Sequence, residues 1–500
     1  MTNEQPLKDF NPELALWRKA YAGHTPATKL LKETHIAPLS AQCLHSLADR
    51  GELHRVDAPA VIRRLLEMQY RGEGPQYGCM RWYWEETTIH DTNAAFFTGL
   101  PLMSMRLRFA DRLDADVIAP LDQLLRAMRV WFRHAVGKRV IHYPNAYLGD
   151  LVCAWLLREI FGEDEHTPAL LEAMQEAADT WRREHWGWGE HMSDIYSTVI
   201  LNQLSILLLV QKHLPESTHQ AYRELMGEIL SIDDRFGAGP RVPAVRSYAF
   251  EACPARVPFR QRFDAADHIL EHFIPRAYPG WDALAPAEVP VATDIRVPCF
   301  GGAEAVARIH PDCRLGSLSR YQFMPGVDPM EWGLCWQSFP VAFWRPAGDW
   351  GFLQFVTQQG DRLRSHPASS RTLSAHDNAL STDCQPPILG ETRSEQDGDH
   401  LHVHRRFPAI SPLWDRVTDR FLLLHPDPAA EIVEHPDGLD LRYPERVVSI
   451  RVKAHSGGVI RVDRGDAGSL SVNVEWSRDV LSRTSEVTSE WWIHLHPGQR

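Results

Sequence analysis

Residues 186–210 read WGWGEHMSDIYSTVILNQLSILLLV, a polar, aromatic turn that runs directly into a strongly apolar segment. Two tryptophans alternate with glycines at the start of this stretch. Residues 186–196 are called the Trp-Gly turn below. The turn carries four groups that can hold or move protons: Glu190, His191, Asp194 and Tyr196. Because the segment 197–210 is apolar enough for a buried helix, the stretch predicts side chains presented into a cavity at a helix start.

This helix is one of a series that fills the first half of the chain. Apolar residues recur at i, i+3, i+4 and i+7 in the segments 58–70, 91–108, 115–136, 145–161, 168–183, 191–213 and 216–230. A helix stop at Phe161-Gly162 precedes a helix start at Thr167-Pro168. Roughly eight to twelve helices of this kind favour a toroid of helical hairpins over a four-helix bundle.

The pattern changes near residue 285. The stretch 278–298 holds several prolines and little helical period, so we predict a toroid domain at 1–285 and a second domain at 286–500. The polar stretch 365–399 is predicted to be a long surface loop. Alternating runs typical of strands lie at 303–310, 351–357, 400–407, 420–424, 447–454, 458–462 and 470–474. The predicted fold class is therefore multidomain α and β, an N-terminal (α/α) toroid followed by a C-terminal antiparallel β-sandwich.

Composition excludes several classes of function. The formal net charge of −12 argues against a nucleic-acid partner, and no apolar run approaches the ~20 residues that span a bilayer, so no membrane partner is expected. The eight cysteines are scattered without a CxxC pair, which indicates reduced thiols. Residues 1–10 lack the apolar core of a secretory signal. We expect a cytoplasmic protein, or a periplasmic or secreted one if the natural protein carries a leader that this chain lacks.

Aromatic and polar groups crowd another helix start at residues 77–99 (YGCMRWYWEETTIHDTNAAFFTG). Aromatic faces stack on sugar rings, and carboxylates and amides bind sugar hydroxyls. The candidate substrate-binding residues here are Trp82, Trp84, Glu86 and Asn93. The alternative is that Asp91 or Thr92 caps the helix while the acids lie in solvent.

A third polar helix start lies at residues 138–150 (KRVIHYPNAYLGD). His142 is a candidate substrate-binding residue, and Asn145 is either the helix N-cap or a residue that faces substrate. Helix starts of a toroid gather at one rim, which favours a shared site with the Trp-Gly turn. In that turn, Trp186 and Trp188 would provide stacking surfaces.

Two further sets of residues have both a structural and a functional interpretation. Arg241 and Arg246 stand in a Gly/Pro-rich loop. They are surface residues or, if the loop covers the cavity, one of them binds an anionic group through two hydrogen bonds from its guanidinium. His400, His402 and His404 alternate along one predicted strand, roughly 7 Å apart. That spacing is too wide for three imidazoles to reach one metal ion, so a solvated sheet edge is the expectation.

Together these residues resemble the toroid-plus-sandwich polysaccharide lyases of the heparinase II/III and chondroitin AC lyase type. The catalytic helix start of those enzymes resembles residues 190–196, and an asparagine at an earlier helix start resembles Asn145. In the chondroitin AC lyase type the order along the chain is Asn, His, Tyr, Arg, and the matching residues follow in that order here: Asn145, His191, Tyr196 and Arg246. The heparinase-like branch adds a histidine from the sheet domain, for which His310 is the candidate.

The resemblance implies β-elimination at a uronic acid of an oligo- or polysaccharide. Asn145 and Arg246 would neutralise the substrate carboxylate. Tyr196 would remove the proton beside it and return a proton to the leaving oxygen, with His191 assisting and Glu190 in the same site. This chemistry demands no metal and no cofactor.

Two other functions stay open. An inverting glycoside hydrolase needs two carboxylates about 6.5–9.5 Å apart, and Glu85, Glu86 or Asp91 could pair with Glu190 or Asp194. A non-catalytic carbohydrate-binding protein is the other, because a fold alone never shows activity. The reaction product separates them, since only a lyase forms an unsaturated sugar. The sequence also leaves open a homo-oligomer.

Overall fold

The structure is a computed structural model of the 500-residue chain. It describes residues 10–11, 16–17, 58–81, 89, 91–187, 189–193, 196–245, 258–262, 287–322, 339–346, 349–360, 362–366, 391–408, 414–424, 426–465 and 468–498. By internal contacts the chain forms two compact units. The helical unit comprises Met1–Arg183, Thr198–Ser231 and Phe259–Ala287, and the sheet unit comprises Glu184–Ser197, Ile232–Pro258 and Glu288–Arg500.

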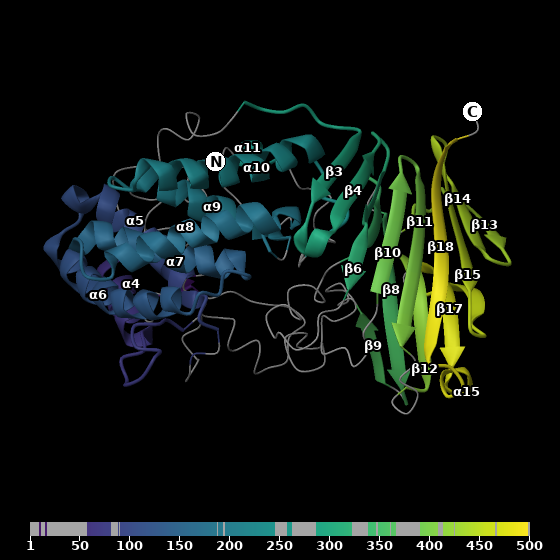
Figure 1. Ribbon diagram of the computed structural model, residues 1–500, viewed down its shortest axis with the longest axis horizontal. Coiled ribbons are helices and arrows are strands. Elements are labelled where there is room, and N and C mark those ends of the chain that lie inside the picture. The colour runs from purple at the N-terminus through teal and green to yellow at the C-terminus, as the bar shows by residue number, and fades with distance from the viewer. Residues whose placement is uncertain are drawn as a thin grey trace. The chain divides into compact units, whose positions relative to one another are not determined.

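The first half of the described chain is helical, as its periodicity predicts (Figure 1, purple to teal). A pair of antiparallel two-residue strands, β1 (Phe10–Asn11) and β2 (Leu16–Trp17), precedes the helices. Apart from single-turn 3-10 segments, the helices are α4 (Ala58–Met68), α5 (Ala94–Arg108), α6 (Ala115–Gly137), α7 (Pro144–Phe161), α8 (Thr167–Glu184), α9 (Tyr196–Val210), α10 (Glu216–Phe236) and α11 (Phe259–Arg262).

The helix predicted at 191–213 begins later than expected. Residues Glu190–Met192 form a separate 3-10 turn, η2, and Ser193 is extended with φ −89° and ψ 131°. The Ser193 hydroxyl then accepts the Tyr196 N–H at 3.1 Å, which satisfies one of the free donors at the start of α9. Tyr196 is therefore the first residue of the helix, and it does not lie one turn inside it.

Close helix contacts in the helical unit depend on a glycine in α7. An added Cβ at Gly149 would lie 2.6 Å from Cγ of Phe96 in α5 and 2.9 Å from Nε2 of Gln203 in α9. These distances are shorter than van der Waals contact. The absence of a side chain at Gly149 is therefore what lets α7 approach both α5 and α9.

The sheet unit contains two antiparallel sheets (Figure 1, green to yellow). One has seven strands in the order β13-β14-β15-β18-β11-β10-β6. The other has nine, in the order β16-β17-β12-β8-β7-β5-β4-β3 with β9 paired to β8. The strands of the first half of this unit are β3 (Asp294–Pro298), β4 (Glu304–Ile309), β5 (Arg314–Leu318), β6 (Arg320–Gln322), β7 (Val341–Trp344), β8 (Trp350–Gln359) and β9 (Arg362–His366).

The remaining strands complete both sheets and supply most of the sandwich core. They are β10 (Glu391–Asp397), β11 (His400–Pro408), β12 (Arg416–Leu424), β13 (Glu431–His435), β14 (Gly438–Arg442), β15 (Arg446–Ala454), β16 (Val459–Arg464), β17 (Leu470–Ser477) and β18 (Glu486–Pro497), with the single-turn helix α15 (Arg478–Leu481). Strand β18 alternates buried and half-buried residues along its length. Its inward side chains, among them Trp491 and Ile493, join one hydrophobic core with inward residues of both sheets.

The sandwich core also encloses a satisfied ion pair. Asp419 of β12 and Arg405 of β11 are almost fully buried, with Arg405 Nε 3.0 Å from the carboxylate. The same carboxylate accepts hydrogen bonds from the Ser489 hydroxyl at 2.5 Å and from the Trp491 indole at 2.9 Å. These three partners compensate for the desolvation of Asp419.

A second core covers the other face of the nine-stranded sheet. Ile232 and Phe236 at the end of α10, with Val242 and Val245, pack there. Arg314 of β5 donates to the backbone carbonyls that follow α10: those of Phe236 (2.9 Å), Ala238 and Pro240 (2.7 Å). The carbonyls left without partners at a helix end are thereby satisfied by the sheet.

Two sequence predictions about the second half are wrong. The predicted loop 365–399 contains β10, whose inward residues are polar (Thr392, Ser394 and Gln396), so the strand lacks apolar alternation; residues 367–390 lie outside the described chain. The histidines at 400, 402 and 404 do not lie on a sheet edge, because β11 pairs with β10 on one side and β18 on the other. Among the described residues no group of three His, Cys, Asp or Glu side chains could hold a metal ion.

Within the part of the chain that the structure describes, every helix is too short or too polar to cross a lipid bilayer.

Substitution of Gly149 by alanine tests the helix contacts. We expect Gly149→Ala to lower the free energy of unfolding by about 1–3 kcal/mol, because the new methyl group overlaps Phe96 and Gln203. The matched control is Gly137→Ala in α6, where an added Cβ has no atom within 4 Å. There the change should be neutral or stabilising by up to about 1 kcal/mol. Equal effects of the two substitutions in urea unfolding would contradict the close approach at Gly149.

Candidate active site

The Trp-Gly turn belongs by its contacts to the sheet unit. Its backbone takes the left-handed conformation at Trp186 (φ 62°), Gly187 (φ 57°) and Gly189 (φ 73°). The glycines adopt this conformation without strain, whereas for a tryptophan it costs of order 1–2 kcal/mol. An added Cβ at Gly189 would lie 2.7 Å from the ring of Phe300, so this glycine also permits a close approach. The ring of Trp186 is fully buried.

His191 is enclosed in the sheet unit and is held by the end of β3. Its Nε2 lies 3.1 Å from the carbonyl oxygen of Pro298 and 3.9 Å from Sγ of Cys299. Since the carbonyl can only accept, Nε2 carries the proton and Nδ1 carries the lone pair. Nδ1 is buried and has no hydrogen-bond partner among the described residues.

His191 is neutral across the physiological pH range. Burial, assisted by the positive charges of Arg241 and His185, lowers the pKa of His191 to about 3, although the bond to Pro298 acts in the opposite direction. An imidazole in this state can donate and accept hydrogen bonds but contributes no positive charge.

Arg241 is not a surface residue and does not present its guanidinium to solvent. It is fully buried, and its Nη2 forms an ion pair with the buried carboxylate of Asp233 at 2.9 Å. Its Nη1 donates to the backbone carbonyl of His191 and lies 3.5 Å from that of Ser193. The role left open for Arg241 in binding an anionic ligand is therefore not supported, because this charge already has a partner.

Glu190 and Tyr196 flank His191 in the same turn. Glu190 is fully buried, and Tyr196 is 8% exposed. The 3-10 turn between them is closed by the Met192 N–H to the Gly189 carbonyl (2.9 Å) and the Ser193 N–H to the Glu190 carbonyl (3.0 Å). Three of the sequence-predicted catalytic residues thus lie on one short, hydrogen-bonded turn.

Asn145 lies in the helical unit, at the second position of α7. The N-cap of this helix is Tyr143 and its first residue is Pro144, so the alternative of Asn145 as N-cap is wrong. Asn145 is fully buried, and its backbone carbonyl accepts a hydrogen bond from Gln203 Nε2 at 2.8 Å.

The starts of α5 and α7 lie side by side in the helical unit. Asn93, the N-cap of α5, donates through Nδ2 to the hydroxyl of Tyr143 at 3.3 Å. The alternative that Asp91 or Thr92 caps this helix is wrong, because Asn93 is the N-cap; Asp91 instead accepts the Asn93 N–H at 2.9 Å, just before the helix. His142, next to Tyr143, is half-buried, and burial lowers its pKa.

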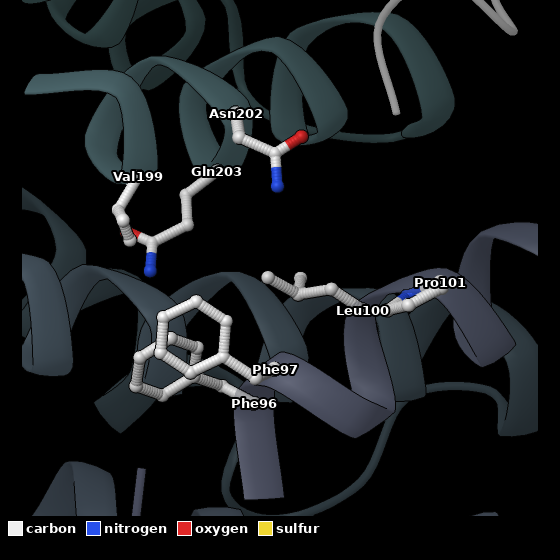
Figure 2. Close-up of a pocket in the computed structure, with 7 residues that line it drawn as sticks. All are labelled: Phe96, Phe97, Leu100, Pro101, Val199, Asn202 and Gln203. Atoms are coloured by element: carbon white, nitrogen blue, oxygen red, sulfur yellow. The ribbon is translucent and has the colours of Figure 1, made fainter. Parts of the chain in front are cut away.

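Sequence reasoning did not single out Gln203. With Asn202 it interrupts an otherwise apolar helix, and this interruption was the available signal. Both residues line a small hollow between α5 and α9, whose other lining residues are Phe96, Phe97, Leu100, Pro101 and Val199 (Figure 2). Gln203 is buried and its side-chain oxygen has no hydrogen-bond partner among the described residues, so the hollow is polar on its α9 side.

Several predicted site residues lie outside the described part of the chain. They are Trp82, Trp84, Glu86, Trp188 and Arg246, together with Glu85 and Asp194 of the hydrolase alternative.

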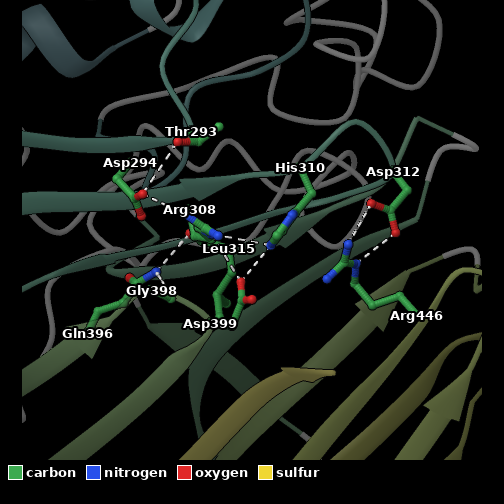
Figure 3. Close-up of polar contacts among 10 residues, drawn as sticks. All are labelled: Thr293, Asp294, Arg308, His310, Asp312, Leu315, Gln396, Gly398, Asp399 and Arg446. Carbon is green, nitrogen blue, oxygen red and sulfur yellow. Dashed lines mark hydrogen bonds and ion pairs between the residues drawn. The ribbon is translucent and has the colours of Figure 1, made fainter. Parts of the chain in front are cut away.

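His310, the candidate histidine of the sheet domain, belongs to a charged cluster in the sheet unit (Figure 3). Its Nε2 lies 2.5 Å from Oδ1 of Asp399, and Arg308 lies 3.2 Å from the same oxygen. Burial alone would raise the pKa of Asp399, but the hydrogen bond from His310 and the charge of Arg308 outweigh it and lower that pKa. Beside this cluster Arg446 forms two bonds with Asp312, at 2.7 and 3.0 Å.

Helices followed by two antiparallel sheets define a protein of the toroid-plus-sandwich class. No protein-family model and no curated protein matches the chain. Among solved structures, heparinase III matches with a TM-score of 0.50 and 10% sequence identity, covering 92% of this chain and 77% of that one. A heparan sulfate lyase HepC mutant from Pedobacter heparinus has a TM-score of 0.33 and 11% identity, with the same coverage of 92% and 77%. The likeness to heparinase III confirms the predicted fold, helices followed by antiparallel sheets.

The buried state of His191 makes stability depend on pH. Its pKa is lower in the folded chain than in the unfolded chain, so its contribution to stability is complete above about pH 6.5 and is lost as the pH falls toward 3. Between pH 7.5 and 4.5 this residue should account for roughly 3 kcal/mol of lost unfolding free energy. The His191→Gln variant should therefore lose about that much less than the wild type in urea titrations at both pH values. The same loss in both proteins would show that His191 is not buried in its neutral form.

Proposed function

We propose that the chain is a polysaccharide lyase that cleaves a uronic-acid-containing glycan by β-elimination. The observation that carries this proposal is the segment 190–196, in which Tyr196 begins a helix five residues after the buried, neutral His191 and six after the buried Glu190. The fold shared with heparinase III supports the same reaction class. The substrate would be an oligo- or polysaccharide.

The reaction begins with removal of a weakly acidic proton. The proton on the carbon beside the uronate carboxylate becomes acidic enough only if the carboxylate charge is neutralised, and Asn145 and Arg246 are the proposed donors. Tyr196 as phenolate takes this proton. The electron pair forms a carbon–carbon double bond as the bond to the glycosidic oxygen breaks, and the same tyrosine returns the proton to the leaving oxygen.

His191 then has a more limited role than a titrating base. With a pKa of about 3 it is neutral, so the positive charge that stabilises the phenolate comes from another group, for which Arg246 is the candidate. We propose that His191, fixed through Nε2 to Pro298, offers Nδ1 as an acceptor of a hydrogen bond. Glu190 and Trp186, both fully buried, would support the turn.

His310 is the proposed histidine of the sheet domain. Its bond to Asp399 fixes the orientation of the imidazole, as a carboxylate does for a histidine that accepts or donates protons. Asn93 and His142 remain the proposed substrate-binding groups of the helical unit, with Trp82, Trp84, Glu86 and Trp188 proposed as partners for sugar rings and hydroxyls.

The reaction products test this proposal. Purified protein is incubated with uronate-containing and neutral glycans, and ultraviolet absorbance and new reducing ends are measured in parallel. A lyase produces both signals on uronate glycans only. Reducing ends without absorbance would show a glycoside hydrolase, and binding without either signal would show the carbohydrate-binding protein.

Tyr196→Phe should lower turnover by at least ~10²-fold with little change in thermal stability, because it removes only the hydroxyl group that carries the transferred proton. The matched control is Tyr222→Phe, since the buried Tyr222 hydroxyl donates to the Met174 carbonyl at 2.9 Å. That variant should lose about 1 kcal/mol of stability and keep its turnover. Full activity of Tyr196→Phe would remove Tyr196 from the mechanism.

A further inference from the structure

We infer that the buried Asp233–Arg241 pair is a positioning device that fixes the Trp-Gly turn, and with it the start of α9 at Tyr196. This role in catalysis rests on the proposed function, whereas the fixing of the turn does not. Asp233 and Arg241 are positioning residues, because neither is proposed to touch the substrate.

The guanidinium of Arg241 joins two parts of the sheet unit. Its Nη2 bonds to the Asp233 carboxylate at 2.9 Å, and its Nη1 faces the backbone carbonyls of His191 and Ser193. These two carbonyls lie on either side of Met192, at the end of the 3-10 turn. Because a guanidinium is planar and rigid, its donors fix the carbonyls relative to Asp233 in both distance and direction.

A simple structural role would not require a charge at this place. Burial of an ion pair costs desolvation energy, and apolar residues of similar volume often replace such a pair without loss of stability. At 0% and 1% exposure of the two side chains, this cost applies in full. What an apolar replacement cannot reproduce is the hydrogen bonding of Arg241 to the turn.

The Asp233–Arg241 pair with its bonds to the turn is called the clamp, and Asp233 is itself held in place. Asp233 lies in the last turn of α10, where its carbonyl accepts the Gly237 N–H at 3.0 Å. The residues after the helix are bound by Arg314 of β5, whose Nη1 lies 2.7 Å from the Pro240 carbonyl. Arg241 therefore bonds the turn to a segment that is itself bonded to the nine-stranded sheet.

Two uncharged contacts hold the turn from other directions. The Pro298 carbonyl accepts a hydrogen bond from Nε2–H of His191, and Phe300 packs against Gly189. Arg241 differs from both because its charge also helps to keep His191 neutral. Loss of Arg241 would thus loosen two backbone carbonyls and make His191 easier to protonate.

The test compares two buried Arg–Asp pairs of the sheet unit. Arg241→Met and Asp233→Asn disrupt the proposed clamp, and Arg405→Met and Asp419→Asn disrupt the matched pair in the sandwich core, where exposure is 2% and 0%. Both sets should lower the melting temperature. Amide hydrogen exchange of residues 189–193, measured well below melting, should be at least ~10-fold faster in the first set only.

Activity gives the second measurement. Turnover per folded molecule on the uronate glycan should fall at least ~10-fold in Arg241→Met and Asp233→Asn, with a smaller change in KM, and should be unchanged in the control pair. Arg241→Lys should recover part of the loss, since lysine keeps the charge without the fork of donors. If Arg241→Met does not fold, the inference is tested by the hydrogen exchange and turnover of Asp233→Asn, since this variant keeps the side-chain volume.

The outcomes separate the two proposals. If the wild type produces no unsaturated product from any uronate glycan, the proposed function fails, while the exchange measurement still tests the clamp. Equal exchange of residues 189–193 in the clamp variants and the control variants would overturn the inference, since the pair would then contribute to stability only.

Discussion

The attachment of the Trp-Gly turn to the sheet unit is the constraint on which the rest of the candidate site depends. The turn interrupts a series of helices in the sequence, but its hydrogen bonds go to residues that follow α10 and to the end of β3. Between α8 and α9 the chain leaves the α-helical conformation at residues 185–187 and 189, where Trp186 takes the left-handed conformation. Such local cost persists only where the surrounding structure fixes it, and Arg241 and Pro298 do so here.

The proposed chemistry draws residues from both compact units. Asn145 is fixed in the helical unit by the bond from Gln203 to its backbone, and Tyr196 is fixed in the sheet unit by Ser193. Helix α9 contains residues of both units: Tyr196 and Ser197 belong to the sheet unit, and the residues from Thr198 onward belong to the helical unit.

Much of the fold could be predicted from the sequence because periodicity reports burial. The helical segments and the strands β4, β8, β11, β12, β15, β16 and β17 were found in this way. Strand β10 was missed because its inward residues are Thr, Ser and Gln, and β7 and β18 were missed although their inward residues are apolar. Local pattern also located the Trp-Gly turn. It could not show that Arg241 is buried against this turn, because the carbonyls of His191 and Ser193 that Arg241 faces lie 50 and 48 residues earlier in the chain. The predicted division near residue 285 stays a prediction.

The burial of His191 also constrains where the proposed reaction obtains its pH dependence. A group with a pKa of about 3 does not change its charge between pH 5 and 9, so any change of turnover in that range must come from other groups. The phenol of Tyr196 needs a cation to ionise near neutral pH, and Arg241 cannot serve, because its charge is paired with Asp233. In the proposed reaction the buried pair would therefore fix geometry, the neutral histidine would supply hydrogen bonds, and the activating charge would come from a third residue, for which Arg246 is the candidate.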